Sequence, residues 1–168
     1  MRRVAALAAL LALLCSPASS AGERGAAATP PPLGAVIGTI VIPKLNLREL
    51  VREGTGAAEL NLGPSHYPWT DLPGEGRTVA IAGHRTTYGA WFRHLDQLVA
   101  GDVIDVVMRP AFGGRSFRYR VTGHRIVPWN AGRTLVRDKG FERLILSACH
   151  PLGSDAFRYV VFAYPVPR

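Results

Sequence analysis

A cysteine, a histidine and an arginine stand at the ends of expected strands, and together they could carry out acyl transfer. Cys149 ends the run 144–148, which is apolar apart from one serine, and Pro151 then prevents further sheet pairing. His84 directly follows another buried strand, and Arg158 begins the strand after the cysteine. A thiolate is a strong nucleophile, and a neighbouring imidazolium stabilises it and can donate a proton to a leaving amine. Arginine stays charged and offers fixed donors to a developing oxyanion.

The spacing of these residues predicts that they share one end of a sheet. Cys149 and Arg158 are nine positions apart, so antiparallel pairing of their strands would bring both to the same end. His150 should point away from this site, because successive strand residues face opposite sides. The other histidines are expected to be structural or to lie on a strand face: His66, His94 and His124.

Each of the three residues also has an ordinary interpretation. A histidine after a glycine often belongs to a turn, a single arginine is usually a surface charge, and a single cysteine can be an inert core residue. The combination of all three at strand ends favours catalysis. A zinc site built from Cys149 and the histidines has no recognised ligand spacing, and we predict neither a metal nor a cofactor.

The first 21 residues have the layout of a secretory signal peptide. Arg2 and Arg3 precede the apolar run 4–14, and small residues follow. This run is shorter than the roughly 20 residues that span a bilayer, so an N-terminal membrane anchor requires residues 15–18 to lie in the lipid as well. Signal peptide and anchor remain alternatives. Both predict an exported protein whose contact with the membrane is through the N-terminus.

The cysteine count agrees with a reactive thiol. The chain has two cysteines, Cys15 in the expected leader and Cys149. Without the leader, the second has no partner for an intramolecular disulfide, and such a residue in an exported protein is reactive or intermolecular. We expect residues 22–35, rich in Gly, Ala and Pro, to be a flexible linker, and residues 36–168 to form a single domain.

The formal net charge of +8 comes largely from arginine. The basic residues are spread along the chain, with no basic helix and no aromatic RNA-reading motif. This distribution argues against nucleic acid as a partner. It favours attraction to an anionic cell envelope.

The remaining pattern predicts an all-β fold. Alternating or continuous apolar runs that are closed by turn residues indicate seven or eight short strands within about 130 residues, typical of a closed or nearly closed β-barrel. We also expect helical spacing over 91–98, a hairpin connection at 111–114, and a loop, short helix or single turn at 54–63 and 133–140. The expected strands lie at 37–42, 47–51, 78–82, 103–107, 115–127, 144–149 and 158–164.

With these residues in view, the chain resembles the sortases, bacterial cysteine transpeptidases that attach proteins to the cell wall or to pilins. The resemblance covers about residues 37–164. It rests on several short motifs that occur in a fixed order: Ile40-Val41-Ile42-Pro43-Lys44-Leu45, Gly63-Pro64-Ser65-His66-Tyr67, Leu72-Pro73-Gly74-Glu75-Gly76, Ala80-Ile81-Ala82-Gly83-His84-Arg85, Gly101-Asp102 and Leu146-Ser147-Ala148-Cys149, with Arg158 downstream.

The resemblance implies a specific fold and reaction. The fold would be the eight-stranded sortase barrel with one or two short helices. His84 would be the general acid and base, Cys149 the nucleophile, and Arg158 a cation that stabilises the transition state or orients the substrate. Exported proteins with a C-terminal sorting signal would be cleaved between Thr and Gly through a thioester. An amine of a cell-wall precursor or a pilin lysine would then accept the acyl group, at the extracellular face of the membrane or in the cell wall.

Individual sequence motifs indicate which class of sortase the chain resembles most. The segments 84–89 and 149–151 look most like the class E sortases of high-GC Gram-positive bacteria, which favours a Leu-Ala-x-Thr-Gly signal over Leu-Pro-x-Thr-Gly. The family usually has Thr where this chain has Ala148, so one hydroxyl is missing beside the cysteine. Residues 22–35 lack the Asp-Pro-aromatic lid motif of pilin-building sortases, which favours an open groove and substrates other than pilin polymers. The acidic calcium-binding loop of some sortases is also missing.

Two other functions remain as alternatives. L,D-transpeptidases also act on peptidoglycan through a cysteine, but they keep histidine and cysteine in a Ser-His-Gly-Cys-like motif that this chain lacks. A non-enzymatic β-barrel that binds the cell envelope is the alternative from a different functional class.

Overall fold

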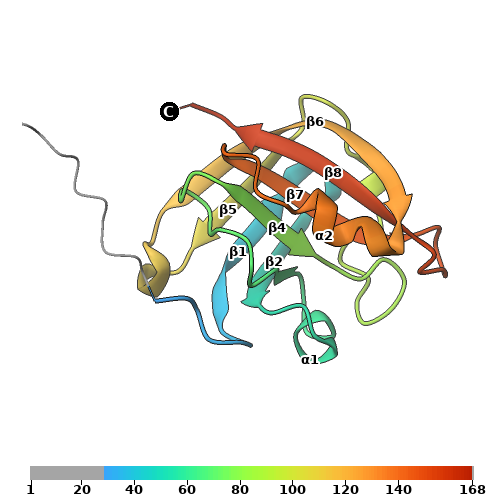
Figure 1. Cartoon of the computed structure of the whole chain (residues 1–168), viewed down its shortest axis with the longest axis horizontal. Helices are drawn as coiled ribbons and strands as arrows, with labels where there is room; N and C mark the ends of the chain where they lie inside the picture. Colours follow the sequence, from blue (N-terminus) through green and yellow to red (C-terminus); the bar gives the residue numbers. More distant parts are fainter. Residues whose placement is uncertain (1–28, 168) are drawn as a thin grey trace, which may run out of the picture.

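Eight strands close into one barrel (Figure 1). The computed structural model describes residues 29–167, so the expected leader and most of the expected linker lie outside the described residues. Around the barrel the strand order is β1-β2-β3-β4-β7-β8-β6-β5, and β5 pairs back to β1. The all-β, eight-stranded prediction is therefore confirmed. The strands are β1 Val36–Ile42, β2 Leu47–Glu53, β3 Ser65–His66, β4 Thr78–Ala82, β5 Val103–Met108, β6 Ser116–Pro128, β7 Arg143–His150 and β8 Phe157–Pro165.

The apolar run before the cysteine forms β7 because both faces of this strand are buried. Leu144 and Leu146 face the main core inside the barrel, whereas Ile145 packs into a second cluster on the outer side of the sheet. Burial on both faces requires a continuous apolar run instead of an alternating one. This explains why β7 and the similarly buried β4 are the clearest strands in the sequence.

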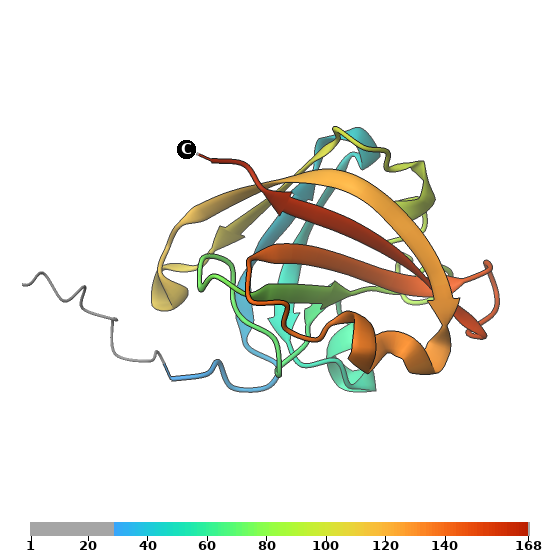
Figure 2. The same ribbon diagram turned by 45° about the horizontal axis from the view of Figure 1, so that its top comes forward.

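The segment that covers the outer cluster contains the α2 turn, Gly132–Leu135, preceded by the 3-10 turn Trp129–Ala131. Figures 1 and 2 show it lying over β7 and β8, and Leu135 and Val136 pack there against Ile145. The single turn expected within 133–140 is thus present. The short α1 helix, Ala57–Leu60, likewise fits the prediction for 54–63.

The expected helix over 91–98 is wrong. The segment contains only the 3-10 helix Leu95–Gln97. Its amides bond three residues back, for example Leu95 N–H to the Phe92 carbonyl at 3.2 Å, which is the pattern of tight turns. Ala90 has a positive φ of 46°, and the Phe92 amide bonds to the His84 carbonyl at 2.9 Å. The apolar spacing therefore reflects burial by successive turns that are attached to the end of β4.

The hairpin between β5 and β6 has the expected position. These strands pair antiparallel, and the 3-10 turn Pro110–Phe112 joins them. At the N-terminal side, the Gly34 amide donates to the Glu53 carbonyl at 2.8 Å, so the last residues before β1 contact the end of β2. No helix within residues 29–167 is long and apolar enough to cross a membrane.

Candidate active site

Strand register brings the histidine, the cysteine and the arginine together. β4 and β7 run parallel with Ala82 opposite Ser147, and the Gly83 amide extends the ladder to the Ser147 carbonyl at 3.0 Å. His84 and Cys149 each lie two positions beyond this pair, so they leave neighbouring strands at the same end. β7 and β8 pair antiparallel with Cys149 directly opposite Arg158. The cysteine thus has one of these side chains on each flank.

A small cavity of about 230 Å³ joins the three residues. Cys149 is a free thiol of intermediate exposure, and His84 is also half-buried. The only histidine that lines the cavity among the described residues is His84. The cavity is lined by Thr55, Leu60, Tyr67, Ala82, Gly83, His84, Ser147, Ala148, Cys149 and Arg158.

His84 is oriented by residues that sequence reasoning did not identify. Its Nε2 lies 3.1 Å from Asn61 Oδ1, at the end of α1, and its ring packs 5.1 Å from the Tyr88 ring, centroid to centroid. A proton on Nε2 bonded to this oxygen leaves Nδ1 free to exchange a proton elsewhere. Desolvation by burial lowers the pKa of His84 from its ordinary value. Burial therefore favours the neutral imidazole over the charged form.

Arg158 is half-buried, and its Nη1 donates to two backbone carbonyls, of Asp155 at 2.7 Å and of Phe157 at 2.9 Å. These bonds hold the guanidinium at the start of β8. The group lines the cysteine cavity and also the adjoining groove described below. A fixed cation in this position can interact with a carbonyl oxygen that approaches the Cys149 sulfur.

Hydroxyl groups line the cavity at Thr55, Tyr67 and Ser147, whereas position 148 supplies none. Ala148 packs in the barrel core and lines the cavity only, whereas Ser147 lines both the cavity and the groove. Burial raises the pKa of the Tyr67 phenol, and a hydrogen bond with the Ser147 side chain opposes this shift. A hydroxyl is therefore available one residue earlier than the family pattern suggested.

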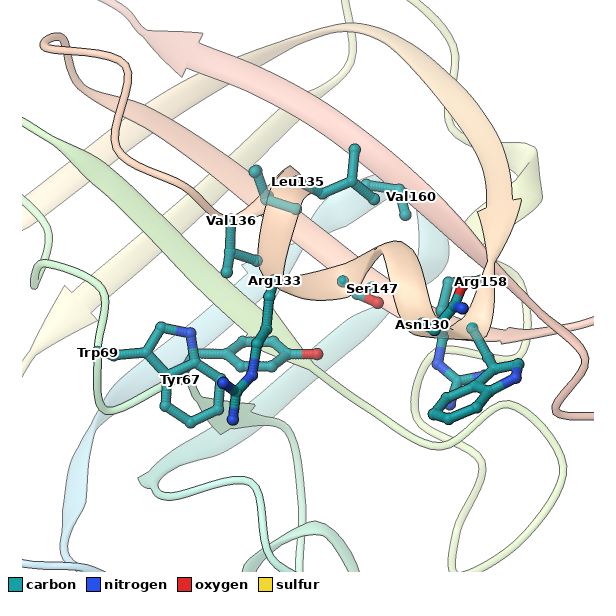
Figure 3. Close-up of a pocket in the computed structure, with 12 residues that line it drawn as sticks. Tyr67, Trp69, Asn130, Arg133, Leu135, Val136, Ser147, Arg158 and Val160 are labelled. Carbon is teal, nitrogen blue, oxygen red and sulfur yellow. The ribbon is translucent and has the colours of Figure 1, made fainter.

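A larger groove continues from the cavity along the outer face of the barrel (Figure 3). It has a volume of about 280 Å³ and shares Tyr67, Ser147 and Arg158 with the cavity. In Figure 3 Arg133 extends towards Tyr67 and Trp69, while Arg158 lies at the other end. Two arginines and no acidic residue line this groove, and the rest of its lining is Tyr67, Trp69, Trp129, Asn130, Gly132, Leu135, Val136, Ile145, Ser147 and Val160.

The remaining histidines lie elsewhere. His66 is buried in β3, His94 is exposed and bonds to Gln97 at 3.2 Å, and His124 stacks on Tyr159 at 4.8 Å. Within residues 29–167, no group of three or more His, Cys, Asp or Glu side chains is arranged to hold a metal ion.

Comparison with known proteins identifies the family. The family model for the sortase domain matches residues 40–166. This chain belongs to the sortase family. It is 30% identical over 135 residues to Sortase D of Bacillus subtilis (strain 168), a match that covers 79% of this chain. The match spans 65% of that relative's own length, slightly less than two thirds.

Solved sortase structures share the barrel. A lid mutant of Sortase A from Corynebacterium diphtheriae superposes with a TM-score of 0.71 at 25% identity, covering 80% of this chain and 72% of that one. Sortase C-1 from Actinomyces oris has the same TM-score, 0.71, at 27% identity, covering 80% and 74%. Sortase C1 from Streptococcus agalactiae gives 0.69 at 29% identity, covering 78% and 67%. These structures belong to several sortase classes, so the likeness does not specify one. The L,D-transpeptidase alternative is wrong, because the chain is a sortase.

Proposed function

We propose that this sortase is a cysteine transpeptidase that cleaves an exported protein between the Thr and Gly of a C-terminal sorting signal. The observation that carries the proposal is the register across β4, β7 and β8. It brings His84, Cys149 and Arg158 to one cavity, although the first two are 65 positions apart in the chain. Family membership supports the same chemistry.

In the first half of the reaction, the thiolate of Cys149 attacks the carbonyl carbon of the substrate threonine. Arg158 donates to the oxyanion of the tetrahedral intermediate. The His84 imidazolium gives its proton to the nitrogen of the departing glycine as the C–N bond breaks. The products are a thioester on the cysteine, a neutral imidazole and a released peptide with a free amino group.

The second half of the reaction reverses these roles. An amine attacks the thioester carbonyl while neutral His84 accepts one proton from the attacking nitrogen. The C–S bond breaks, and Cys149 returns as the thiolate beside the imidazolium. An amide bond joins the substrate threonine to the acceptor. The acceptor in this proposal is an amine of a cell-wall precursor or a pilin lysine.

The groove is the proposed binding site for the sorting signal. It opens into the cysteine cavity through shared lining residues, and aliphatic side chains such as Val136, Ile145 and Val160 line it. An extended peptide advances about 3.3 Å per residue, so a signal with its threonine at Cys149 has its preceding residues along this lining. Because segments 84–89 and 149–151 resemble the sequences of class E sortases, we propose a Leu-Ala-x-Thr-Gly signal.

We also propose that residues 1–21 direct export, as a signal peptide or an anchor, and that residues 22–35 connect them to a catalytic domain over 36–168. The protein then acts on the extracellular face of the membrane or in the cell wall. Its substrates reach it as exported chains.

A transpeptidation assay tests the proposal. The purified protein is incubated with a Leu-Ala-x-Thr-Gly peptide, a matched Leu-Pro-x-Thr-Gly peptide and an excess of a primary amine. We expect the threonyl product joined to the amine, formed faster from the first peptide, and no product with Cys149→Ala. A non-enzymatic envelope-binding barrel would release no peptide fragment that begins with the glycine of the signal. Activity that survives Cys149→Ala would contradict the proposal.

A further inference from the structure

A buried arginine lies on the inner side of the same strand ends. Arg85 directly follows His84 and is only 2% exposed. Successive residues leave a strand on opposite sides, so His84 and Cys149 face the cavity while Arg85 and His150 face inward. The prediction that His150 points away from the cavity is confirmed by its contact with this arginine.

The guanidinium of Arg85 bridges segments that are distant in the chain. Its Nη1 lies 3.0 Å from His150 Nδ1 and 3.5 Å from the Cys149 carbonyl oxygen. Its Nη2 pairs with Asp96 Oδ1 at 3.0 Å, and its Nε donates to the Arg93 carbonyl at 3.3 Å. The group therefore connects the residue after His84 with the residue after Cys149. It also connects both with the turn segment that follows β4.

These contacts fix more than the position of one side chain. Arginine only donates hydrogen bonds, so His150 Nδ1 must accept and its proton must be on Nε2. The Arg85 carbon Cζ also lies 5.4 Å from the centroid of the Tyr159 ring, which buries the cation further. A buried charge is costly unless its donors are used. Here those donors are directed at the backbone and side chain of the strand that holds the cysteine.

We propose that Arg85 is a positioning residue that sets the separation between the His84 imidazole and the Cys149 sulfur. The proposal rests on the function proposed above. β4 and β7 end at Ala82 and His150, so sheet pairing does not hold the chain beyond Gly83 on the β4 side. Beyond that point, the contact between the Arg85 guanidinium and His150 connects the two segments. Arg85 directly follows His84, and His150 directly follows Cys149.

A purely structural role for Arg85 would give a different outcome from a positioning role. If Arg85 only fills the end of the barrel, its variants lose activity in proportion to the fraction that unfolds. If it positions the reactive pair, folded variants lose the rate of acylation while substrate affinity is kept. A displacement of about 1 Å at a reacting centre can cost about 100-fold in rate.

The experiment compares four variants of the full protein. Arg85→Lys keeps the charge and can still pair with Asp96, but it lacks the fork that reaches the β7 strand. His150→Leu removes the acceptor, and His150→Gln is its matched control, which keeps an acceptor at similar size. Asp96→Asn leaves an acceptor at the far end of the guanidinium. Each variant is assayed for thermal unfolding, for the rate of thioester formation and for KM with the peptide.

We expect folded Arg85→Lys and His150→Leu to acylate up to about 100-fold more slowly, with KM unchanged. His150→Gln and Asp96→Asn should keep rates near that of the unchanged protein. If Arg85→Lys fails to fold, the His150 pair decides the question. Acylation at the unchanged rate in the folded Arg85 and His150→Leu variants overturns the proposal, as does equal loss in His150→Leu and His150→Gln.

A second readout separates this proposal from the proposed function. The rate at which iodoacetamide alkylates Cys149 is measured against pH, because it reports the thiolate–imidazolium pair without any peptide. We expect the profile to shift in Arg85→Lys and His150→Leu but not in His150→Gln. If the unchanged protein turns over no peptide, the proposed function fails, while the alkylation profiles still decide the role of Arg85.

Discussion

Two histidines at neighbouring strands of this barrel have opposite surroundings. His66 in β3 is 1% exposed, and its Nδ1 lies 2.8 Å from a carboxylate oxygen of Glu53, which is 2% exposed. Its Nε2 lies 3.0 Å from both the Asp71 carbonyl and the Thr70 hydroxyl. His84 is half-buried at the end of β4 and lines a cavity, and within residues 29–167 its ring has one hydrogen-bond partner, the side-chain amide of Asn61.

The difference shows how one residue type serves structure in one place and chemistry in another. Both nitrogens of His66 lie within hydrogen-bonding distance of oxygen atoms, so the ring is held in the connection between β3 and β4. His84 keeps Nδ1 uncommitted within a cavity that also holds a free thiol. A group that must gain and lose a proton during a reaction needs such an uncommitted atom. The Glu53–His66 pair therefore has a structural role, whereas the role proposed for His84 is catalytic.

The largest loss of activity is expected from substituting the proposed catalytic residues Cys149 and His84. Cys149→Ala should abolish thioester formation, and His84→Ala should reduce it by about 100-fold to 10,000-fold, because the thiolate loses its proton donor and acceptor. Both side chains are partly exposed, so thermal unfolding should stay close to that of the unchanged protein. Rates of peptide cleavage, measured with circular dichroism melts on the same samples, check this. Full activity in folded His84→Ala would remove the distinction between the two histidines.

Breaking the buried pair should have the reverse effect. Glu53→Ala leaves His66 Nδ1 without its hydrogen-bond partner, and a buried polar group left unpaired costs about 1–3 kcal/mol of unfolding free energy. Activity per folded molecule should be kept, because neither residue lines the cavity. Urea unfolding and active-site titration of the thiol measure the two quantities. Unchanged stability with lost activity would mean that this cluster takes part in the chemistry.

Arg158 should behave like His84 and unlike the buried cluster. Arg158→Lys keeps a positive charge but loses the planar donors, and loss of one oxyanion donor typically costs about 100-fold to 1,000-fold in kcat. The substitution also removes the bonds from its Nη1 to the β7–β8 loop, so unfolding is followed in parallel. The expected result is a lower rate of acylation with little change in stability. A large loss of stability at unchanged kcat would mean that Arg158 has a structural role and not a catalytic one.

The smallest effect concerns the proton of His84 itself. Desolvation lowers its pKa, so its NMR titration in Cys149→Ala should have a midpoint below about 6.5. The unfolded chain then binds this proton more tightly than the folded one. The contribution of His84 to stability is thus fully present above about pH 6.5 and is lost as the pH falls through the folded pKa.

Tyr88→Ala, which uncovers the ring, should move this midpoint back towards the ordinary value. A midpoint at or above about 6.5 in Cys149→Ala would contradict the desolvated environment.

Local signals explain which parts of this site could be predicted from the sequence. The shared location of Cys149 and Arg158 was predictable because a hairpin relates them by short spacing, and the strand-end position of His84 was predictable because a buried strand precedes it. Arg85 and Asn61 were not, because their partners lie far away in the chain. The helix predicted over 91–98 was wrong for the same reason, because distant contacts decide the local structure. The spacing of the apolar residues reflects which side chains are buried, whereas the backbone hydrogen bonds depend on contacts with the end of β4.

The central claim is that Cys149 forms a thioester with the substrate threonine, and intact-protein mass spectrometry tests it most directly. The protein is mixed with a sorting-signal peptide without added amine and quenched in acid within the first turnover. We predict a mass increase equal to the peptide up to its threonine minus one water, located on Cys149, removed by hydroxylamine and not formed by Cys149→Ala. Peptide cleavage without such an adduct, or an adduct on another residue, would contradict the account.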